Sequence, residues 1–268
     1  MLADERRHRI REILAVQRTV TVAALTQAMS VTTATVRRDL ARLELEGVLI
    51  RSHGGATSRS ASTDLQLPYE ALQRANRAEK QMIALEAERL IQEGDTVFLE
   101  GSTTVFELAC LLTNRSHLTV VTNSPPILEK LQRSAGVTVM STGGELQKDT
   151  AYLTGVWAQQ ALSQIRVDKA IFGVSAIDSS YGVSTTRPGL AEIKKLLVRC
   201  AKKRIALADH SKFGQQDFVY VGPVTDYDII VTDAKASPSH IAKLRELGVE
   251  VVIAGPHGHK ESREKRPL

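Results

Sequence analysis

Apolar residues recur at intervals of three and four through the first 45 residues, which is the period of amphipathic helices. The pattern predicts one helix over residues 4–16, a second that starts at Thr21, and a third that starts near Thr32 or Thr33. Threonine favours these starts, because its hydroxyl accepts a hydrogen bond from a free backbone N–H group of the first turn. The residues expected on the inward faces are Ile10, Ile13, Leu14, Val22, Leu25, Met29, Val36, Leu40 and Leu43.

The second and third helices would be separated by Ser30 and Val31 alone, and the third would end at Gly47. A short turn between two short helices is the helix-turn-helix pattern. After the third helix, residues 48–50 favour a strand and Gly54-Gly55 favours a turn, which together indicate a short hairpin. The helices and the hairpin predict a winged helix-turn-helix.

Short apolar runs alternate with helical patterns in the rest of the chain. The runs predict strands over residues 96–100, 118–122, 137–141, 169–175, 204–209, 228–233 and 249–254. The helical patterns cover residues 79–93, 104–112, 125–134, 189–199 and 238–247. Such alternation indicates a mainly parallel sheet covered on both faces. The predicted fold class is therefore α/β, with an N-terminal winged helix-turn-helix domain and a larger, mainly parallel α/β domain.

These patterns divide the 268 residues into four parts. The winged helix-turn-helix domain would occupy residues 1–56, a linker residues 57–75, and the α/β domain residues 76–254. The linker begins with polar residues, and a charged helical stretch follows from Tyr69 to about residue 80. The basic composition of residues 255–268 is typical of a disordered tail.

Charge is spread unevenly along the chain. Residues 1–60 contain ten arginines, no lysine and six acidic residues, which gives a net charge of +4 and suggests an anionic partner. No apolar run is long enough to span a membrane, and the N-terminus lacks the apolar region of a secretory signal. Cys110 and Cys200 are far apart in apolar surroundings, as expected of thiols in a reducing compartment. We therefore expect a cytoplasmic protein with no membrane partner.

The third predicted helix carries two adjacent arginines, Arg37 and Arg38. If Val36 faces the core, they lie about 100° and 200° further around the helix, towards solvent. The start of this helix is where such motifs meet base edges in the major groove of DNA, and Asp39 is expected to orient one of the arginines. The wing would reach a flanking phosphate or the minor groove. The expected DNA-binding residues are Thr21, Thr32, Thr33, Thr35, Arg37, Arg38, Arg51 and His53.

Small and polar residues follow several predicted strands, at residues 100–104, 122–124, 142–144 and 209–212. In an open α/β sheet, ligands bind outside the carboxyl ends of the strands. Gly101 permits close backbone approach, and the hydroxyl and N–H groups after it lie at a helix start, where the helix dipole favours anions. Lys212 adds a positive charge at another strand end. The pattern predicts a site for an anion the size of phosphate.

The N-terminal motifs resemble those of the DeoR family of bacterial transcriptional regulators. The family signature stands here as Arg6, Ile10 and Leu14, followed by Thr32 and the run from Thr35 to Leu40. The family's wing motif stands as Arg51-Ser52-His53-Gly54-Gly55-Ala56. This resemblance implies binding to double-stranded operator DNA, with repression as the expected outcome.

Residues 76–254 are similar to the effector domain of that family, which resembles sugar-phosphate isomerases of the ribose-5-phosphate isomerase type. The resemblance implies a phosphorylated sugar or a related metabolite as effector, and implies no cofactor or metal. Glu100 stands where the family more often has aspartate. The effector-binding residues that the motifs and the resemblance indicate are Glu100, Gly101, Ser102, Thr103, Thr104, Thr122, Asn123, Gly143, Gly144, Lys194, Asp209 and Lys212.

Two other functions fit parts of the pattern. A sugar-phosphate isomerase with a DNA-binding appendage would need a positioned carboxylate base. The acidic isomerase motif corresponds to residues 173–178, which keep one acid, Asp178, and the isomerase glutamate falls at Ile193, with Glu192 one residue off. This favours a sensor over an enzyme. The third possibility is a DNA-binding protein whose larger domain only dimerises. A homodimer or homotetramer is expected, because two recognition helices can then reach successive major-groove faces.

Overall fold

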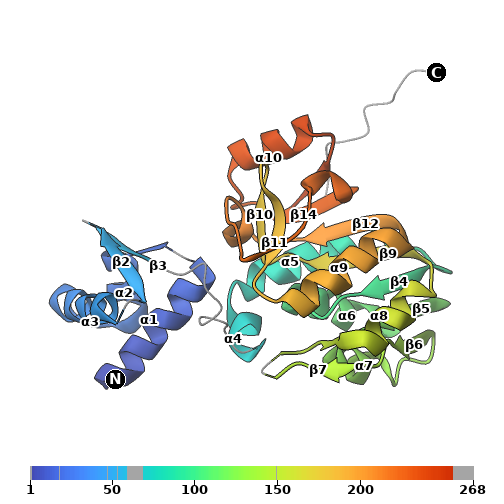
Figure 1. Ribbon diagram of the computed structural model, residues 1–268, viewed down its shortest axis with the longest axis horizontal. Coiled ribbons are helices and arrows are strands. Elements are labelled where there is room, and N and C mark those ends of the chain that lie inside the picture. The colour runs from blue at the N-terminus through green and yellow to red at the C-terminus, as the bar shows by residue number, and fades with distance from the viewer. Residues whose placement is uncertain are drawn as a thin grey trace.

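The computed structural model describes residues 2–17, 19–46, 48–52, 54–58, 69–148 and 150–255. Figure 1 shows two groups of elements, a small N-terminal one and a larger one built on a central sheet. Within the described ranges, no helix is both long enough and apolar enough to cross a lipid bilayer. The predicted tail begins at Gly255, and its other residues lie outside the described residues.

The N-terminal elements confirm the predicted winged helix-turn-helix. Helix α2 is capped by Thr21, whose Oγ1 accepts a hydrogen bond from the N–H of Ala24 at 3.1 Å. Helix α3 is capped in the same way by Thr32, which accepts from the N–H of Thr35 at 3.3 Å. Strand β1 was not predicted, because three residues are too short to establish a period. The elements are α1 (Ala3–Gln17), β1 (Thr19–Thr21), α2 (Val22–Met29), α3 (Thr33–Leu45), β2 (Leu49–Ser52) and β3 (Gly55–Ser58).

The predicted inward faces form the core of this domain. Ile13 and Val22 are partly buried against the core, and the other seven predicted residues are buried. Strand β3 pairs with both β1 and β2, so the sheet has the order β1-β3-β2 and closes over the helices. Strand β3 extends to Ser58.

The larger domain contains a seven-stranded sheet in which every neighbouring pair of strands is parallel. The strand order is β15-β14-β12-β9-β4-β5-β6. All seven predicted strands are present, which confirms the predicted sheet. They are β4 (Thr96–Leu99), β5 (Leu118–Thr122), β6 (Val137–Ser141), β9 (Val167–Gly173), β12 (Ala201–Leu207), β14 (Ile229–Asp233) and β15 (Glu250–Ala254).

Strand order reverses between β4 and β9. The chain first builds β4, β5 and β6 in one direction, then returns to place β9 on the other side of β4 and continues outwards to β15. At such a reversal the connections leave the sheet in opposite directions, and a crevice opens at the carboxyl ends of the two central strands. The residues that follow β4 and β9 are therefore the best-placed residues of the sheet to meet a ligand.

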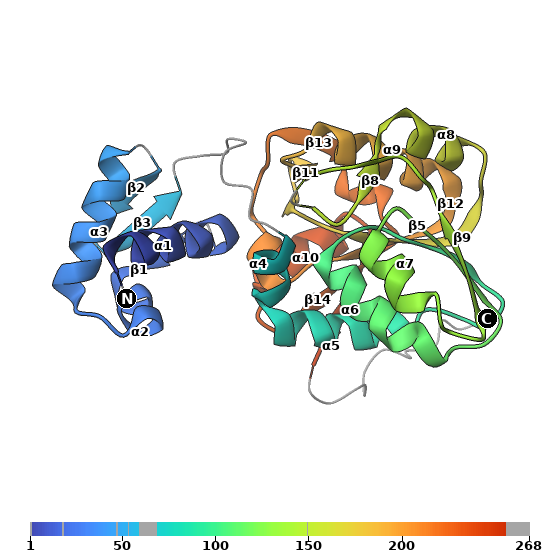
Figure 2. The ribbon, with the colours of Figure 1, turned by 90° about the horizontal axis from the view of Figure 1, so that it is seen from below.

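Helices cover both faces of the sheet (Figure 2). Alternating residues of β4 point to opposite faces, so Phe98 packs in one core with α8 and α9, while Val97 and Leu99 pack in the other with α5, α6 and α7. The helices are α5 (Arg77–Glu88), α6 (Thr103–Leu111), α7 (Pro125–Leu131), α8 (Gly155–Ser163), α9 (Pro188–Cys200) and α10 (Pro238–Glu246).

Two features differ from the predictions. The charged helical stretch from Tyr69 is broken into α4 (Tyr69–Arg74) and α5, because Asn76 adopts a left-handed conformation with a φ of 49°. Helix α8 was not predicted. The small sheets were not predicted either, since their strands are only two to four residues long. These strands are β7 (Glu145–Leu146), β8 (Leu153–Thr154), β10 (Ala176–Asp178), β11 (Gly182–Thr185) and β13 (Val219–Gly222).

Candidate DNA-binding and effector sites

Helix α3 exposes Arg37 and Arg38 to solvent. Across the described part of the chain, neither guanidinium forms a hydrogen bond or ion pair. Every other arginine that the structure describes in the N-terminal domain lies within 4.0 Å of a carboxylate; these are Arg6, Arg7, Arg9, Arg11, Arg42 and Arg51. Among the described arginines of this domain, the two without a nearby carboxylate are therefore neighbours on the exposed side of α3.

Three threonines lie at the start of α3, about one turn before these arginines. Thr32 and Thr33 are exposed and Thr35 is half-buried, and the hydroxyls of Thr32 and Thr35 lie 2.9 Å apart. Thr21 is exposed and caps α2, which leaves its own hydroxyl proton available to a phosphate oxygen. The helix start thus presents hydroxyl groups beside cationic groups.

In the wing, Arg51 lies on β2 with its guanidinium 3.7 Å from a carboxylate oxygen of Glu44. Its backbone N–H donates to the other oxygen of Glu44 at 3.1 Å. A phosphate would therefore compete with Glu44 for this side chain. His53 lies outside the described residues.

The expectation that Asp39 orients Arg37 or Arg38 was wrong. Asp39 is buried and accepts a hydrogen bond from Nε of Arg6, on α1, at 2.8 Å. The helical period explains the error, because a residue three positions after Val36 lies only about 60° from it, on the core side. Asp39 thus joins α3 to α1, and it does not pair with Arg37 or Arg38.

Glu100 and Lys194 meet at the carboxyl ends of β4 and β9. Both are buried, and Nζ of Lys194 lies 3.2 Å from Oε1 of Glu100. The N–H of Gly173 donates to Oε2 of Glu100 at 2.9 Å, and Lys194 donates to the carbonyl of Gly173 at 2.5 Å. The two predicted effector residues are therefore an ion pair that ties β4, β9 and α9 together at the reversal of strand order.

The loops after β4 and β5 are joined at Gly101 and Asn123. The N–H of Gly101 donates to Oδ1 of Asn123 at 3.0 Å, and Asn123 donates to the carbonyl of Leu153 at 3.1 Å. A Cβ at position 101 would lie 2.7 Å from Cβ of Tyr152, so only glycine fits there. Thr122 donates to the carbonyl of Leu99 at 2.6 Å. Gly101, Thr122 and Asn123 thus shape the backbone at these strand ends.

The other predicted residues of this region occupy neighbouring helix and strand ends. Ser102 caps α6, and Thr103 and Thr104 are buried in its first turn. Gly143 and Gly144 have φ values of 63° and 115°, and a Cβ at Gly144 would lie 2.4 Å from the carbonyl oxygen of Thr154. Gly144 therefore allows the loop after β6 to lie close to the end of β8.

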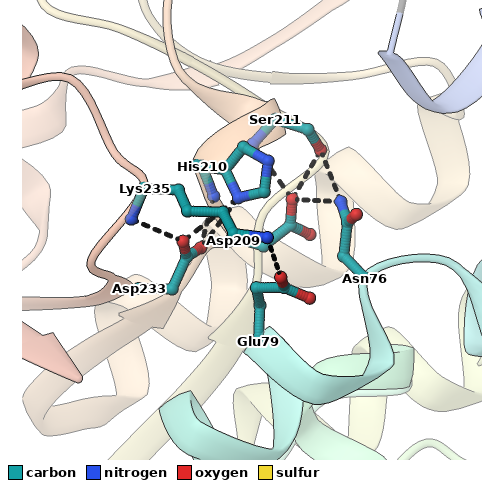
Figure 3. A network of polar contacts seen from close by, with 7 residues as sticks. All are labelled: Asn76, Glu79, Asp209, His210, Ser211, Asp233 and Lys235. Atoms are coloured by element: carbon teal, nitrogen blue, oxygen red, sulfur yellow. Dashed lines mark hydrogen bonds and ion pairs between the residues drawn. The ribbon is translucent and has the colours of Figure 1, made fainter. Parts of the chain in front are cut away.

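Asp209, after β12, is buried and caps the short 3₁₀ turn His210–Lys212. Its Oδ1 accepts hydrogen bonds from the N–H of Ser211 and from Nδ2 of Asn76, each at 3.0 Å (Figure 3). Burial opposes ionisation of Asp209, but the charge of Lys212 and the hydrogen bonds from Ser211 hold its pKa below the ordinary value. The ionised carboxylate of Asp209 and the half-exposed side chain of Lys212 thus both lie after the end of β12.

Sequence patterns did not indicate Lys80 as a residue of this site, although it interacts electrostatically with Lys212 and Asp209. It is buried on α5, and its Nζ donates to the carbonyls of Leu72 and Ala75, at and just beyond the end of α4. Burial and then the charge of Lys212 lower the pKa of Lys80 to about 8, although Asp209 opposes this shift. In the sequence it is one cation in a charged helix, and nothing there distinguishes it from a solvated residue.

A polar network connects the start of α5 to the loops after β12 and β14 (Figure 3). Besides the contact between Asn76 and Asp209, Lys235 forms an ion pair with Glu79 at 2.5 Å. Asp233 accepts hydrogen bonds from the backbone N–H groups of His210 and Lys235 at 2.7 and 2.9 Å. Among the described residues, no group of three histidine, cysteine or acidic side chains could hold a metal ion.

A winged helix-turn-helix joined to an α/β domain with polar residues at its strand ends is the architecture of a ligand-responsive transcription regulator. A model of the DeoR-like helix-turn-helix domain matches residues 6–62, and a model of the DeoR C terminal sensor domain matches residues 75–234. The chain belongs to the DeoR family of transcriptional regulators.

The chain is 36% identical to the transcriptional repressor AccR of Agrobacterium fabrum, over 86% of this chain and 90% of that protein. It is 30% identical to the lactose phosphotransferase system repressor of Lactococcus lactis, over 92% of this chain and 97% of that protein. Among solved structures, ribose 5-phosphate isomerase A of Methanocaldococcus jannaschii aligns with a TM-score of 0.40 and 17% identity. That alignment covers 52% of this chain and about half, 55%, of the isomerase.

The buried ion pair leads to a stability prediction. Lys194→Met would leave the carboxylate of Glu100 buried without its counter-charge, so the free energy of unfolding should fall by about 3–5 kcal/mol. Urea denaturation measures this loss. The matched control is Lys195→Met, because Lys195 lies next along α9 but pairs with Glu192 at the surface and should lose about 1 kcal/mol or less. Equal losses in the two variants would contradict a structural role for the Glu100–Lys194 pair.

The depressed pKa of Lys80 predicts a dependence of stability on pH. Between pH 8 and 10.5, the unfolded chain holds a proton on Lys80 that the folded chain has released, so this group adds stability as pH rises. The unfolding free energy of the wild type minus that of Lys80→Met should therefore increase with pH over this window. The same difference for Lys243→Met, which removes an exposed lysine, should stay flat. A flat difference for Lys80 as well would contradict the lowered pKa.

Proposed function

We propose that this regulator binds double-stranded operator DNA through α3 and represses a carbohydrate-metabolism operon until a phosphorylated sugar binds its larger domain. The observation that carries the first half is the isolation of Arg37 and Arg38 from every described carboxylate. A guanidinium that already has a carboxylate partner must lose it before it binds a phosphate or guanine. Arg37 and Arg38 lose nothing but water, so they are the arginines best prepared for DNA.

The remaining DNA contacts follow from position. Thr32, Thr33 and Thr35 lie at the start of α3. From there their hydroxyls can bind phosphates and their methyl groups can contact the methyl group of thymine. Thr21 stands at the start of α2, and Arg51 and His53 belong to the predicted wing. Because Arg51 exchanges Glu44 for a phosphate, its net contribution to affinity should be smaller than that of Arg37 or Arg38.

For the effector, we propose a site that spans the carboxyl ends of β4, β5, β9 and β12. Lys212, with its neighbour Lys80, supplies positive charge for the phosphate, and Asp209 supplies a carboxylate for a sugar hydroxyl. The proposed contact set is Glu100, Gly101, Ser102, Thr103, Thr104, Thr122, Asn123, Gly143, Gly144, Lys194, Asp209 and Lys212. The reversal of strand order between β4 and β9 supports this location.

A sensor rather than an isomerase is supported by the carboxylates that could serve as a base. Asp178 accepts hydrogen bonds from the backbone N–H groups of Ser180 and Tyr181 in an exposed turn. Glu192 is exposed and pairs with Lys195, while Ile193 is buried in the core. Incubation with ribose 5-phosphate should therefore yield no ketose phosphate, and detected turnover would overturn the sensor assignment.

The contacts of Lys80 and Asn76 suggest how the effector reaches the DNA-binding domain. Lys80 binds the carbonyls of Leu72 and Ala75, at and just beyond the end of α4, a helix that lies within the predicted linker, and Asn76 binds Asp209. A phosphate beside Lys212 attracts the ammonium of Lys80 away from those carbonyls and frees the end of α4. The linkage is reciprocal, so operator DNA weakens effector binding by the same factor.

We further propose that the protein acts in the cytoplasm as a homodimer or homotetramer. Oligomer contacts would lie within residues 76–254, since this part is large enough to hold both an effector and a partner. Two copies then present two α3 helices to successive turns of the major groove.

The DNA-binding proposal is tested by Arg37→Ala and Arg38→Ala. Each should weaken binding by about 1–3 kcal/mol if the arginine contacts a base in a bidentate manner, with no change in the thermal unfolding transition. Binding is measured by fluorescence anisotropy at one salt concentration, on a duplex selected from a random pool by the wild type. Arg42→Ala is the control, because Arg42 is exposed on the same helix but paired with Glu46 at 3.0 Å. Wild-type affinity in both test variants would refute the assigned face.

The effector proposal is tested by Lys212→Ala. The variant should bind operator DNA as the wild type does but should no longer release it when sugar phosphates are added. Lys243→Ala, which removes an exposed lysine of α10, should keep the response. If Lys212→Ala responds as the wild type does, the phosphate does not bind at Lys212.

A further inference from the structure

Six buried side-chain oxygens lack a hydrogen-bond partner within the described part of the protein. Three of the six, Oε1 of Glu100, Oγ of Ser124 and the hydroxyl of Tyr152, belong to residues beside Gly101. Burying one such group without a partner costs about 1–3 kcal/mol. Their concentration at a strand end of the proposed effector site therefore requires a physical explanation.

The backbone brings these three residues together. A Cβ at Gly101 would lie 2.7 Å from Cβ of Tyr152 and 3.3 Å from Cβ of Ser124, and Glu100 is the preceding residue. Glu100, Ser124 and Tyr152 are 0%, 1% and 6% exposed, so bulk water does not solvate them. We refer to Glu100, Ser124 and Tyr152 as the hydroxyl subsite.

Local structure does not account for the free hydroxyl of Ser124. A serine at the start of a helix usually accepts a hydrogen bond from the first turn. Helix α7 begins with Pro125 and Pro126, neither of which has an N–H to offer, and the side chain of Ser124 makes no capping bond. The backbone N–H of Ser124 is already bound by Thr122 at 3.0 Å. The serine hydroxyl is thus left for another partner.

The chemistry of the hydroxyl subsite matches an uncharged polar group. Lys194 balances the charge of Glu100, but the contact is an ion pair without a hydrogen bond, so Oε1 keeps its capacity to accept a hydrogen bond from a ligand. The hydroxyls of Ser124 and Tyr152 both donate and accept. A sugar hydroxyl also donates one hydrogen bond and accepts others, whereas a phosphate would meet the carboxylate of Glu100.

The spacing of the sheet relates this subsite to Lys212. Strands β4 and β12 lie on either side of β9, so their ends are roughly 10 Å apart, twice the distance between neighbouring strands. An extended ligand with its phosphate near Lys212 can therefore place its far end at the hydroxyl subsite. The guanidinium of Arg187 lies 6.0 Å from the centre of the Tyr152 ring and helps to hold that ring in place.

We infer that Ser124 and Tyr152, together with Glu100, bind a hydroxyl group of the sugar effector and select sugar phosphates over other phosphorylated metabolites. This inference rests on the proposed effector site and adds two residues that determine its specificity. A site built to hydrogen-bond a hydroxyl discriminates strongly against analogues that lack it, because its buried groups are then left unpaired.

The experiment compares Tyr152→Phe and Ser124→Ala with the wild type by calorimetry. The probes are ribose 5-phosphate, glucose 6-phosphate, fructose 6-phosphate, galactose 6-phosphate, tagatose 6-phosphate and inorganic phosphate. Each variant should bind the sugar phosphate preferred by the wild type about tenfold more weakly, yet bind inorganic phosphate with unchanged affinity. Tyr220→Phe removes an exposed phenol hydroxyl on β13 and should behave as the wild type. Thermal unfolding of every variant verifies that it is folded.

The outcomes separate the subsite from the effector site on which it rests. If Lys212→Ala abolishes sugar phosphate binding but Tyr152→Phe and Ser124→Ala bind normally, the hydroxyl subsite is overturned and the effector site stands. If both variants lose inorganic phosphate and sugar phosphate equally, the residues are structural and the inference fails. If no sugar phosphate binds the wild type better than inorganic phosphate does, the proposed effector class fails together with the subsite.

Discussion

The organisation of the larger domain depends on the buried ion pair between Glu100 and Lys194. It lies where the order of strands reverses, and through Gly173 it joins the ends of β4 and β9 to helix α9. A charged pair is expensive to bury, and apolar residues of similar volume often stabilise a core at least as well. Its position beside the unpartnered hydroxyls of Ser124 and Tyr152 is the reason for including it in the proposed effector site.

A second set of contacts joins the ends of the strands to the segment between α4 and α5. Asn76 immediately precedes α5, Glu79 and Lys80 lie in its first turn, and all three contact groups outside that turn. Their partners include the loops after β12 and β14 and the end of α4. These contacts join the strand ends to the junction of α4 and α5, where Asn76 adopts a left-handed conformation.

Elements with a long apolar or periodic sequence pattern could be predicted, and elements with a short pattern could not. The seven parallel strands are continuous apolar runs that alternate with helical patterns, so they and the helix-turn-helix were predicted correctly. Strand β1, the strands of the small sheets, helix α8 and the break at Asn76 were missed; the missed strands have only two to four residues, over which no period develops. The role of Asp39 was misjudged because it was grouped with its sequence neighbours instead of with the helical face that it shares with Val36.

The sequence by itself determined the two-part architecture, the inward faces of its helices and the polar residues that end its strands, because these depend on local periodicity and residue chemistry. Only the tertiary structure decided which charges remain available. Arg6 and Arg38 are the same residue type, yet one meets Asp39 across a helix interface while the other meets no described carboxylate. The pairing of Lys194 with Glu100 was likewise decided by folding, since only packing brings these distant residues within 3.2 Å of each other.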